Sequence, residues 1–281
     1  METGNKIIPI GLFIDNSLNK NESVVHNICL FIGFGRLQSI VFDKKNQKVL
    51  ALLDVVYSNN LLDIIQSFPH LKYSYKGVEV VLQNPNVSLI PSAIYSKEKD
   101  ELYLKLPHFK LGNEQVYSRA LNNTDAVAVF FDDKNLFYLI QQNFYNARIS
   151  HSSVSYSDSM LLNTKNESGE YVFVNMFSSS FELLVIKNGK LLIYNVFDCN
   201  TPENFVYFLL FTSEQLKLNV ETLFLQLSGD IQKSDKYYQL ISNYIKNIVF
   251  LNKPSQLLLT SSLNEVKEHQ YSKLYYHLIC E

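Results

Sequence analysis

Tryptophan is absent from this 281-residue sequence, and cysteine and arginine occur only three times each. Cys29, Cys199 and Cys280 are far apart, and no CxxC or Cys/His spacing suited to zinc occurs. A disulfide framework and a structural zinc site are therefore not expected, and the cysteines are predicted to be small core residues. The scarcity of arginine and the net charge of -2 argue against a nucleic-acid surface, which needs clustered cations.

Long apolar runs are also missing. The longest, residues 205–211, is far shorter than the roughly 20 residues that a membrane-spanning helix needs, so no membrane insertion is expected. The first residues lack the basic stretch and apolar segment of a signal peptide. Both observations favour a cytoplasmic location.

Familiar catalytic motifs are absent as well. The sequence has no Walker A, GxSxG, HExxH or GxGxxG pattern, so no catalytic residue, metal site or cofactor is predicted. His151, Ser152 and Asp158 allow a hydrolase hypothesis, but a triad is defined by geometry, and a capping or core-edge histidine is the favoured interpretation. For Asp132 and Asp133, a turn or helix N-cap is favoured over paired acid/base chemistry.

What the sequence does contain is a repeated order of elements. Apolar residues make up 47% of the chain, enough for a sizeable core. Strand-like runs at 28–34, 37–43 and 48–57 precede a helical pattern at 59–68 and a strand at 77–82. The same order returns as strands at 171–177, 181–187 and 190–197, a helix at 201–218 and a strand at 222–227. The first and fourth strands start roughly 50 residues apart in both copies, which indicates a duplication.

Local signals support the second copy. Asn188-Gly189 is typical of a tight hairpin, and Thr201-Pro202 is typical of a helix start. The helix after Thr201 is apolar on nearly all sides and is predicted to be buried on more than one face. This copy continues with a helix at 234–246 and a strand at 248–251. A C-terminal aromatic stripe at residues 271–278 has helical spacing and is interpreted as core.

The first copy continues less regularly, with strands at 87–90, 126–131 and 147–150 and helices at 135–146 and 155–162. The polar, breaker-rich stretch 163–170 is the best domain boundary. The predicted division is an N-terminal subdomain at 1–165, with an insertion at about 85–122, and a C-terminal subdomain at 166–281.

The paired copies resemble the actin-like ATPase fold, also described as ribonuclease H-like. The resemblance implies an α/β protein with two subdomains, each a mixed five-stranded sheet flanked by helices. Residues 173–231 carry it most clearly. Within this fold the chain resembles an uncharacterised family of Bacteroidota proteins known as a domain of unknown function. It is more distantly similar to the actin-like cytoplasmic subunits of type IV pilus and type II secretion systems.

The resemblance also implies where a nucleotide would bind. Active members of the fold carry an Asp-x-Gly hairpin at the end of the first strand. This sequence reads LFIGFGR there, so Phe31 replaces the acid while Gly33 and Gly35 remain.

The other two nucleotide motifs lie in the second copy. VNMFSSSF places Asn175 where the fold has an acid and Phe177, Ser178, Ser179 and Ser180 where it has glycines. LSGDI keeps only Gly229 of a paired-glycine turn. Losing the carboxylates that hold magnesium should remove several kcal/mol of barrier stabilisation, which predicts a pseudo-ATPase rather than an enzyme. Gly33, Gly35, Asn175, Ser178, Ser179, Ser180 and Gly229 are the predicted remnants of a binding cleft.

The leading hypothesis is therefore a non-catalytic scaffold that acts through an unknown protein partner, and a homo-oligomer is compatible with it. The alternative is a sensor that binds a nucleotide or small molecule between the subdomains without hydrolysis.

Overall fold

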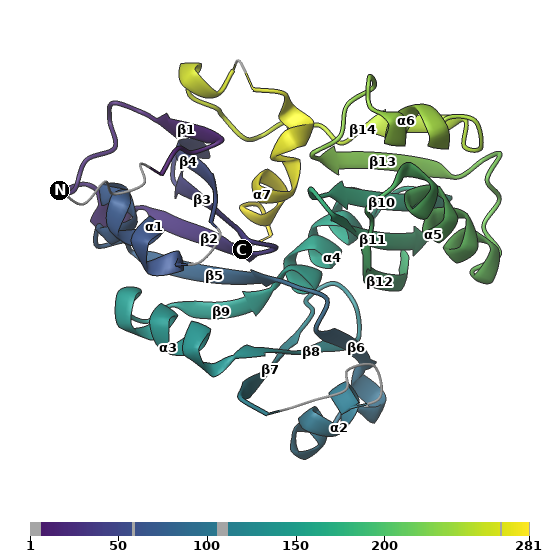
Figure 1. The fold of residues 1–281 in the computed structure, drawn as a ribbon, viewed down its shortest axis with the longest axis horizontal. Coiled ribbons are helices and arrows are strands. Elements are labelled where there is room, and N and C mark those ends of the chain that lie inside the picture. Colours follow the sequence, from purple (N-terminus) through teal and green to yellow (C-terminus); the bar gives the residue numbers. More distant parts are fainter. Residues whose placement is uncertain (1–6, 58–59, 106–111, 265, 281) are drawn as a thin grey trace.

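A computed structural model describes residues 7–57, 60–105, 112–264 and 266–280. Two sheet-based lobes lie side by side, with helices α4 and α7 between them and a small third sheet below (Figure 1). The helices are α1 (Leu61–Ser67), α2 (Asp100–Lys105), α3 (Lys134–Asn143), α4 (Ser152–Asn163), α5 (Pro202–Gln215), α6 (Lys236–Ile241) and α7 (Ser272–His277). Short 3-10 helices are η1 (Ser23–Val25), η2 (Pro69–Lys72), η3 (Ser92–Ile94), η4 (Lys97–Lys99), η5 (Ser261–Leu263) and η6 (Glu268–Gln270).

The first sheet has the order β1-β4-β3-β2-β5-β9. Its strands are β1 (Gly11–Ile14), β2 (Asn27–Gly33), β3 (Arg36–Asp43), β4 (Lys48–Val56), β5 (Gly77–Gln83) and β9 (Arg148–His151). The strands β2, β3 and β4 form an antiparallel meander, and β5 and β9 continue it in parallel. The predicted mixed sheet is confirmed, and the edge strand β1 adds a sixth strand that was not predicted.

The second sheet repeats this arrangement in the order β12-β11-β10-β13-β14. Its strands are β10 (Glu170–Met176), β11 (Ser180–Lys187), β12 (Lys190–Asp198), β13 (Phe224–Gly229) and β14 (Asn247–Phe250). The predicted Asn188-Gly189 hairpin is confirmed, because both residues have positive φ, 50° and 73°. Thr201 caps α5 through its side chain, as predicted, whereas α6 is shorter than the expected helix at 234–246.

The third sheet has the order β6-β8-β7, with β6 (Val87–Pro91), β7 (Glu114–Ala120) and β8 (Ala126–Asp133). It includes the predicted strands 87–90 and 126–131, together with β7, which was not predicted. Helix α2 packs on it through Leu104, which is fully buried with Val127, Val129 and Phe131.

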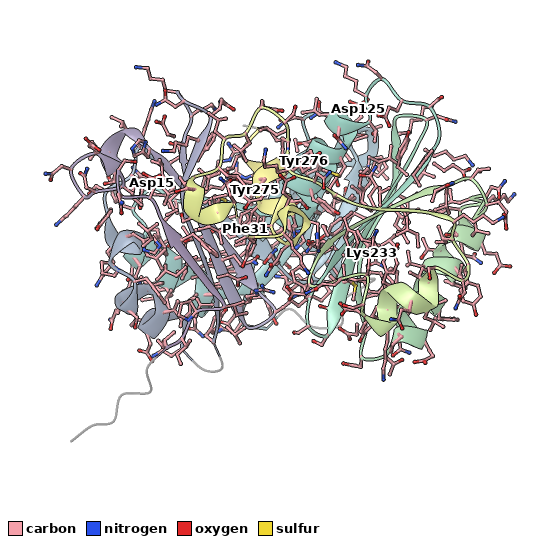
Figure 2. All side chains as sticks on the ribbon, turned by 90° about the horizontal axis from the view of Figure 1, so that it is seen from above. Asp15, Phe31, Asp125, Lys233, Tyr275 and Tyr276 are labelled. Carbon is pink, nitrogen blue, oxygen red and sulfur yellow. The ribbon has the colours of Figure 1, made fainter. Side chains whose placement is uncertain are left out.

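Each main sheet is covered on both faces. Helices α1 and α3 cover one face of the first sheet, and α5 and α6 cover one face of the second. The inner faces pack against α7 and α4. Leu274 and Tyr275 of α7 pack in one hydrophobic cluster with Phe31 of the first sheet. Figure 2 shows Phe31 and Tyr275 near each other between the lobes. The aromatic stripe at 271–278 is thus part of the core, as interpreted, and it packs on the first lobe. The division of the chain into subdomains at residue 165 stays a prediction.

One expectation about α5 is wrong. Phe205, Val206 and Leu209 are buried, but Tyr207 and Phe211 are 58% and 45% exposed. The side of the helix that carries Tyr207 and Phe211 stays uncovered, and these two rings stack on each other with centroids 5.7 Å apart, whereas Phe208 stacks on Phe197 of β12.

Cys29 and Cys199 are buried, as predicted for core cysteines, and Cys280 is half-buried. Within the described residues, no helix combines the length and apolar character needed to cross a membrane.

Candidate functional site

The first hairpin of the predicted cleft joins β2 to β3. Phe34 and Gly35 form its tip, with φ of 51° and 66°. A side chain on Gly33 would place Cβ 1.8 Å from the carbonyl oxygen of Gln83 on β5. Gly33 is therefore required by the close approach of β5, a packing reason that is independent of any phosphate.

The second hairpin joins β10 to β11. Ser178 and Ser179 are exposed at its tip, whereas Ser180 is buried. The backbone of this turn is used internally: the Phe177 N–H donates to the Ser180 carbonyl at 2.8 Å, and the Ser179 carbonyl accepts from the Cys199 N–H at 2.8 Å. The three serines thus lie in two environments, Ser178 and Ser179 at the surface and Ser180 in the interior.

The third predicted element is the turn after β13. Gly229 has φ of 79°, and a Cβ there would lie 2.2 Å from the Met176 carbonyl oxygen. Asn175 is buried next to it and accepts a hydrogen bond from the Ser228 hydroxyl at 3.1 Å. Asn175 and Gly229 are therefore brought together, with polar groups that are already paired.

The two hairpins meet across the space between the lobes. The rings of Phe34 and Phe177 are in contact, with centroids 4.5 Å apart. Phe31, at the position expected for the metal-binding acid, is fully buried and packs edge-on against His277 at 5.1 Å. Aromatic side chains thus lie where the two hairpins face each other.

A buried ion-pair network connects the lobes beside these rings. Arg36 on β3 makes a bidentate pair with Asp54 on β4 and reaches Asp230, after β13, at 2.5 Å. Burial by itself lowers the pKa of the Arg36 guanidinium, but the two carboxylates outweigh burial and raise that pKa. Arg36 therefore stays charged and bridges the first lobe to the second.

A second network centres on Glu182 of β11, whose side chain is completely buried. Its carboxylate pairs with Lys273 of α7 and accepts hydrogen bonds from Ser152 at the start of α4 and from Tyr194 of β12, the latter at 2.7 Å. Burial lowers the pKa of the Lys273 ammonium, and Glu182 opposes this effect. The same ammonium lies 5.4 Å from the centre of the Phe177 ring.

The cleft retains very little empty space. The cavity between the lobes, bounded by Arg36, Asn175, Phe177, Gly229 and Asp230, has a volume of about 10 Å³. That is room for about one water molecule, whereas pockets for small ligands usually exceed about 300 Å³. The described residues contain no group of three or more His, Cys, Asp or Glu side chains placed to hold a metal ion.

The hydrolase arrangement does not form. The Ser153 N–H donates to His151 Nδ1, so His151 caps α4, and Nε2 lies 3.0 Å from the Asn84 carbonyl oxygen. The Ser152 hydroxyl bonds to Glu182 and Tyr194 instead, and Asp158 accepts from the backbone N–H groups of Asn122 and Asn123. The capping interpretation of His151 is confirmed, as is that of Asp133, which caps α3.

The residues that close the cleft were mostly missed from the sequence. Phe34 and Arg36 lie inside the predicted first hairpin but were not singled out. Asp54, Glu182 and Asp230 were also overlooked, although an acidic residue within or directly after an apolar strand is an available signal of a buried charge that needs a partner.

Residues 15–248 match the family described as Protein of unknown function (DUF3822). The chain belongs to this family. Comparison with curated proteins gives no match.

Solved structures confirm the fold of this DUF3822 member. A Bacteroides thetaiotaomicron protein with actin-like ATPase fold and unknown function is similar, with a TM-score of 0.81 at 19% identity, covering 94% of this chain and 99% of that one. The PilM-PilN type IV pilus biogenesis complex follows with a TM-score of 0.64 at 12% identity, covering 92% and 99%. The ethanolamine utilization protein EutJ from Carboxydothermus hydrogenoformans gives 0.51 at 8%, covering 95% and 93%. The actin-like ATPase fold expected from the sequence is therefore confirmed.

Replacing Lys273 by Met should strongly destabilise the protein, because it leaves the Glu182 carboxylate buried without its cation. We expect a loss of about 3–5 kcal/mol in the free energy of unfolding, measured by urea denaturation. Lys246→Met is the matched control, since it removes a surface pair with Glu221 whose partners are 72% and 59% exposed, and it should cost no more than about 1 kcal/mol. Equal costs for the two variants would contradict the assigned role of Lys273.

Acid should weaken the fold through His151. Complete burial lowers the pKa of His151 to about 4, below its ordinary value near 6.5. Between pH 4 and pH 6.5, His151 is therefore neutral in the folded protein and takes up a proton on unfolding. Its contribution to the free energy of unfolding is present in full above pH 6.5 and is lost as the pH falls toward 4. We expect about 2 kcal/mol less stability from this group at pH 5 than at pH 7.5. His151→Asn keeps a capping acceptor and should remove this share of the pH dependence, leaving the share of His70, whose pKa burial also lowers to about 4; an unchanged slope would show that His151 does not contribute.

Proposed function

We propose that this protein is a non-catalytic member of the actin-like ATPase fold that acts by binding a protein partner in the cytoplasm. The observation that carries the proposal is the filled cleft. The Phe34–Phe177 contact and the Arg36–Asp230 pair join the lobes across the nucleotide position that the resemblance implies, and they leave about 10 Å³.

The charges in the cleft support the same conclusion. Catalysis of phosphoryl transfer depends on a metal ion held by carboxylates and on positioned positive charge. Here Asp54 and Asp230 are paired with Arg36, and Glu182 is paired with Lys273. Each of these carboxylates is therefore already in an ion pair with a cation of the protein itself, and Asp54 and Asp230 share the guanidinium of Arg36. Binding magnesium would require breaking a buried or half-buried ion pair, which opposes both ATP turnover and the alternative of a nucleotide sensor.

A role through protein contacts is supported by one similar structure. PilM is described in a complex with PilN, which shows that this fold serves as a binding partner in at least one case. Of the three arginines, Arg36 is buried in the cleft, and the net charge of -2 means that the chain carries no excess of cations for a nucleic-acid surface.

The proposal is tested by titrating the protein with Mg-ATP in a calorimeter and assaying phosphate release in parallel. We expect neither saturable binding nor turnover. The double variant Phe34→Gly/Phe177→Gly removes both rings and should still show no turnover, because the carboxylates remain paired. Saturable ATP binding with hydrolysis by the unmodified protein would overturn the proposal, and saturable binding without hydrolysis would favour the sensor. Affinity capture from native lysate followed by cross-linking tests the partner, and recovery of no stoichiometric protein would contradict that part.

A further inference from the structure

A cavity of about 450 Å³, a volume typical of small-molecule pockets, lies at the C-terminal ends of the two helices between the lobes. Asn163 is the last residue of α4, Tyr276 belongs to α7, and the segment 253–256 after β14 forms the third side. The cavity shares no described lining residue with the cleft. Helix α4 extends about 16 Å from Ser152, beside Glu182, to Asn163. An inference about this cavity is thus independent of the proposed function.

The cavity contains one cation without a carboxylate partner. Lys253 is half-buried, and its ammonium donates one hydrogen bond, to the Leu257 carbonyl oxygen at 3.1 Å. The Glu268 carboxylate accepts from the backbone N–H of Lys253 at 3.3 Å but does not reach its ammonium. Within the described part of the chain, no Asp or Glu lines the cavity and none pairs with this ammonium. Two of its three hydrogens therefore remain for a ligand.

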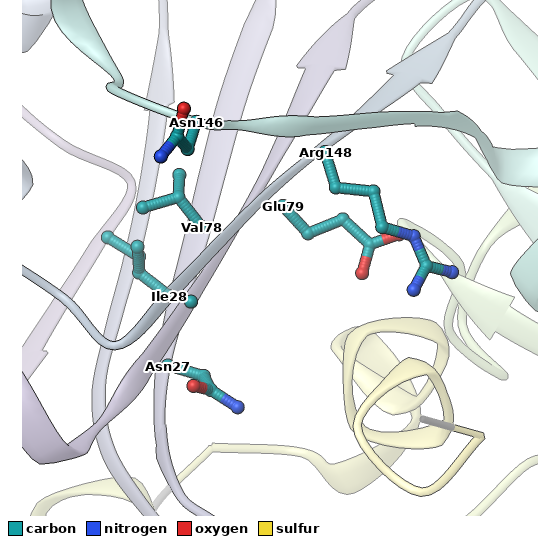
Figure 3. Close-up of a pocket in the computed structure, with 7 residues that line it drawn as sticks. Asn27, Ile28, Val78, Glu79, Asn146 and Arg148 are labelled. Carbon is teal, nitrogen blue, oxygen red and sulfur yellow. The ribbon is translucent and has the colours of Figure 1, made fainter.

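A second cavity, of about 250 Å³ at the starts of β2, β5 and β9, differs in this respect (Figure 3). Its Glu79 carboxylate is almost completely buried and faces Arg148 at 3.8 Å and His277 at 3.3 Å. The acid and the bases there are already paired with each other, whereas Lys253 has only a neutral carbonyl oxygen.

The side chain of Asn163 adds a positioned neutral donor to the cavity. The hydroxyl of buried Tyr276 donates to Asn163 Oδ1 at 3.2 Å. Because this bond uses the amide oxygen, the amide nitrogen is left as a donor, and none of the described residues accepts a hydrogen bond from it.

The remaining wall is apolar. Leu162 is 40% exposed, Ile279 is half-buried and Pro254 is buried. Tyr276 and Ile279 belong to the hydrophobic cluster around α4. An apolar chain placed over Leu162 and Ile279 would remove further apolar surface from water, which is favourable.

The C-terminal end of α4 carries a partial negative charge, which by itself opposes an anion. Two of its last carbonyl oxygens are already used, since those of Met160 and Leu162 accept from the N–H groups of Thr164 and Lys165 at 3.0 Å and 3.3 Å. The full charge of the Lys253 ammonium outweighs a helix-end charge of about half a unit.

We propose that this cavity binds a monocarboxylate with a short apolar chain. The ligand carboxylate accepts hydrogen bonds from the Lys253 ammonium and the Asn163 amide, because hydrogen bonds between ionised groups are the stronger kind. The ligand chain covers Leu162 and Ile279. A ligand ammonium is disfavoured because the described lining offers it no carboxylate, and a dianion is disfavoured because only one cation faces it.

The test uses hexanoate as the probe, with 1-hexanol and acetate as probes that each lack one of its two features. Binding to the full chain is followed by chemical-shift changes in amide NMR spectra. Hexanoate should shift the amides of Lys253, Ser255 and Gln256 saturably. The uncharged 1-hexanol and the chainless acetate should each bind roughly tenfold or more weakly.

Lys253→Met should weaken hexanoate binding roughly tenfold or more, because it removes the cation and keeps the length of the side chain. Lys165→Met is the control of equal charge change: Lys165 is exposed just after α4, does not line the cavity, and its variant should bind as the unmodified protein does. Asn163→Asp leaves the Lys253–Leu257 hydrogen bond and the acceptor for Tyr276 in place, and it should also weaken binding by repelling the carboxylate. The proposal is overturned if hexanoate gives no saturable shifts, if 1-hexanol binds equally well, or if Lys253→Met and Lys165→Met have the same effect.

Discussion

The carboxylate of Glu182 is completely buried, and a carboxylate removed from water needs a cation and hydrogen-bond donors close to it. Its partners come from several elements: Lys273 from α7, Ser152 from α4, and Tyr194 and Asn175 from two neighbouring strands of the same sheet. Helix α7 is at the same time part of the core of the first lobe through Leu274 and Tyr275. The charge on Glu182 therefore fixes how α4, α7 and the second sheet sit relative to each other, and with them the two lobes.

This constraint explains why the space between the lobes is filled. Once Lys273 is fixed by Glu182, its ammonium lies near the ring of Phe177, and that ring packs on Phe34 of the other lobe. Arg36 adds a second connection to Asp230. A two-lobed protein that works by opening and closing needs a hinge and weak contacts across the cleft. Here the contacts across the cleft are a buried guanidinium, an aromatic pair and a nearby ammonium, which favour a single arrangement.

Much of the fold could be predicted because its signals are local. The strand runs, the Asn188-Gly189 turn and the Thr201 cap each depend on a few neighbouring residues, and the repeated spacing revealed the duplication. Edge strand β1 was missed because a run of only four residues is too short to identify as a strand, and β7 was missed because it is mostly polar and half-exposed. The exposed side of α5 was also misjudged, since an aromatic residue has the same pattern whether it is buried or at the surface.

The closure of the cleft was the least predictable feature, because its contacts join residues distant in sequence. Arg36 and Asp230 are separated by 194 positions, and Glu182 and Lys273 by 91. Local periodicity carries no record of such pairs, although charged residues within apolar segments show that partners must exist. The resemblance assigned Asn175 and Gly229 to the same cleft, and the structure places them next to each other. That Asn175 is hydrogen-bonded to Ser228 and Glu182 could be learned only from the three-dimensional arrangement.

The protein's own side chains hold the two lobes in one closed arrangement. Spin labels at Lys45→Cys in the first lobe and Lys190→Cys in the second, in a Cys280→Ser background, report the distance between the lobes by pulsed electron paramagnetic resonance. We expect one narrow distance distribution that is the same with and without Mg-ATP. Two resolved distances, or a shift when Mg-ATP is added, would contradict it.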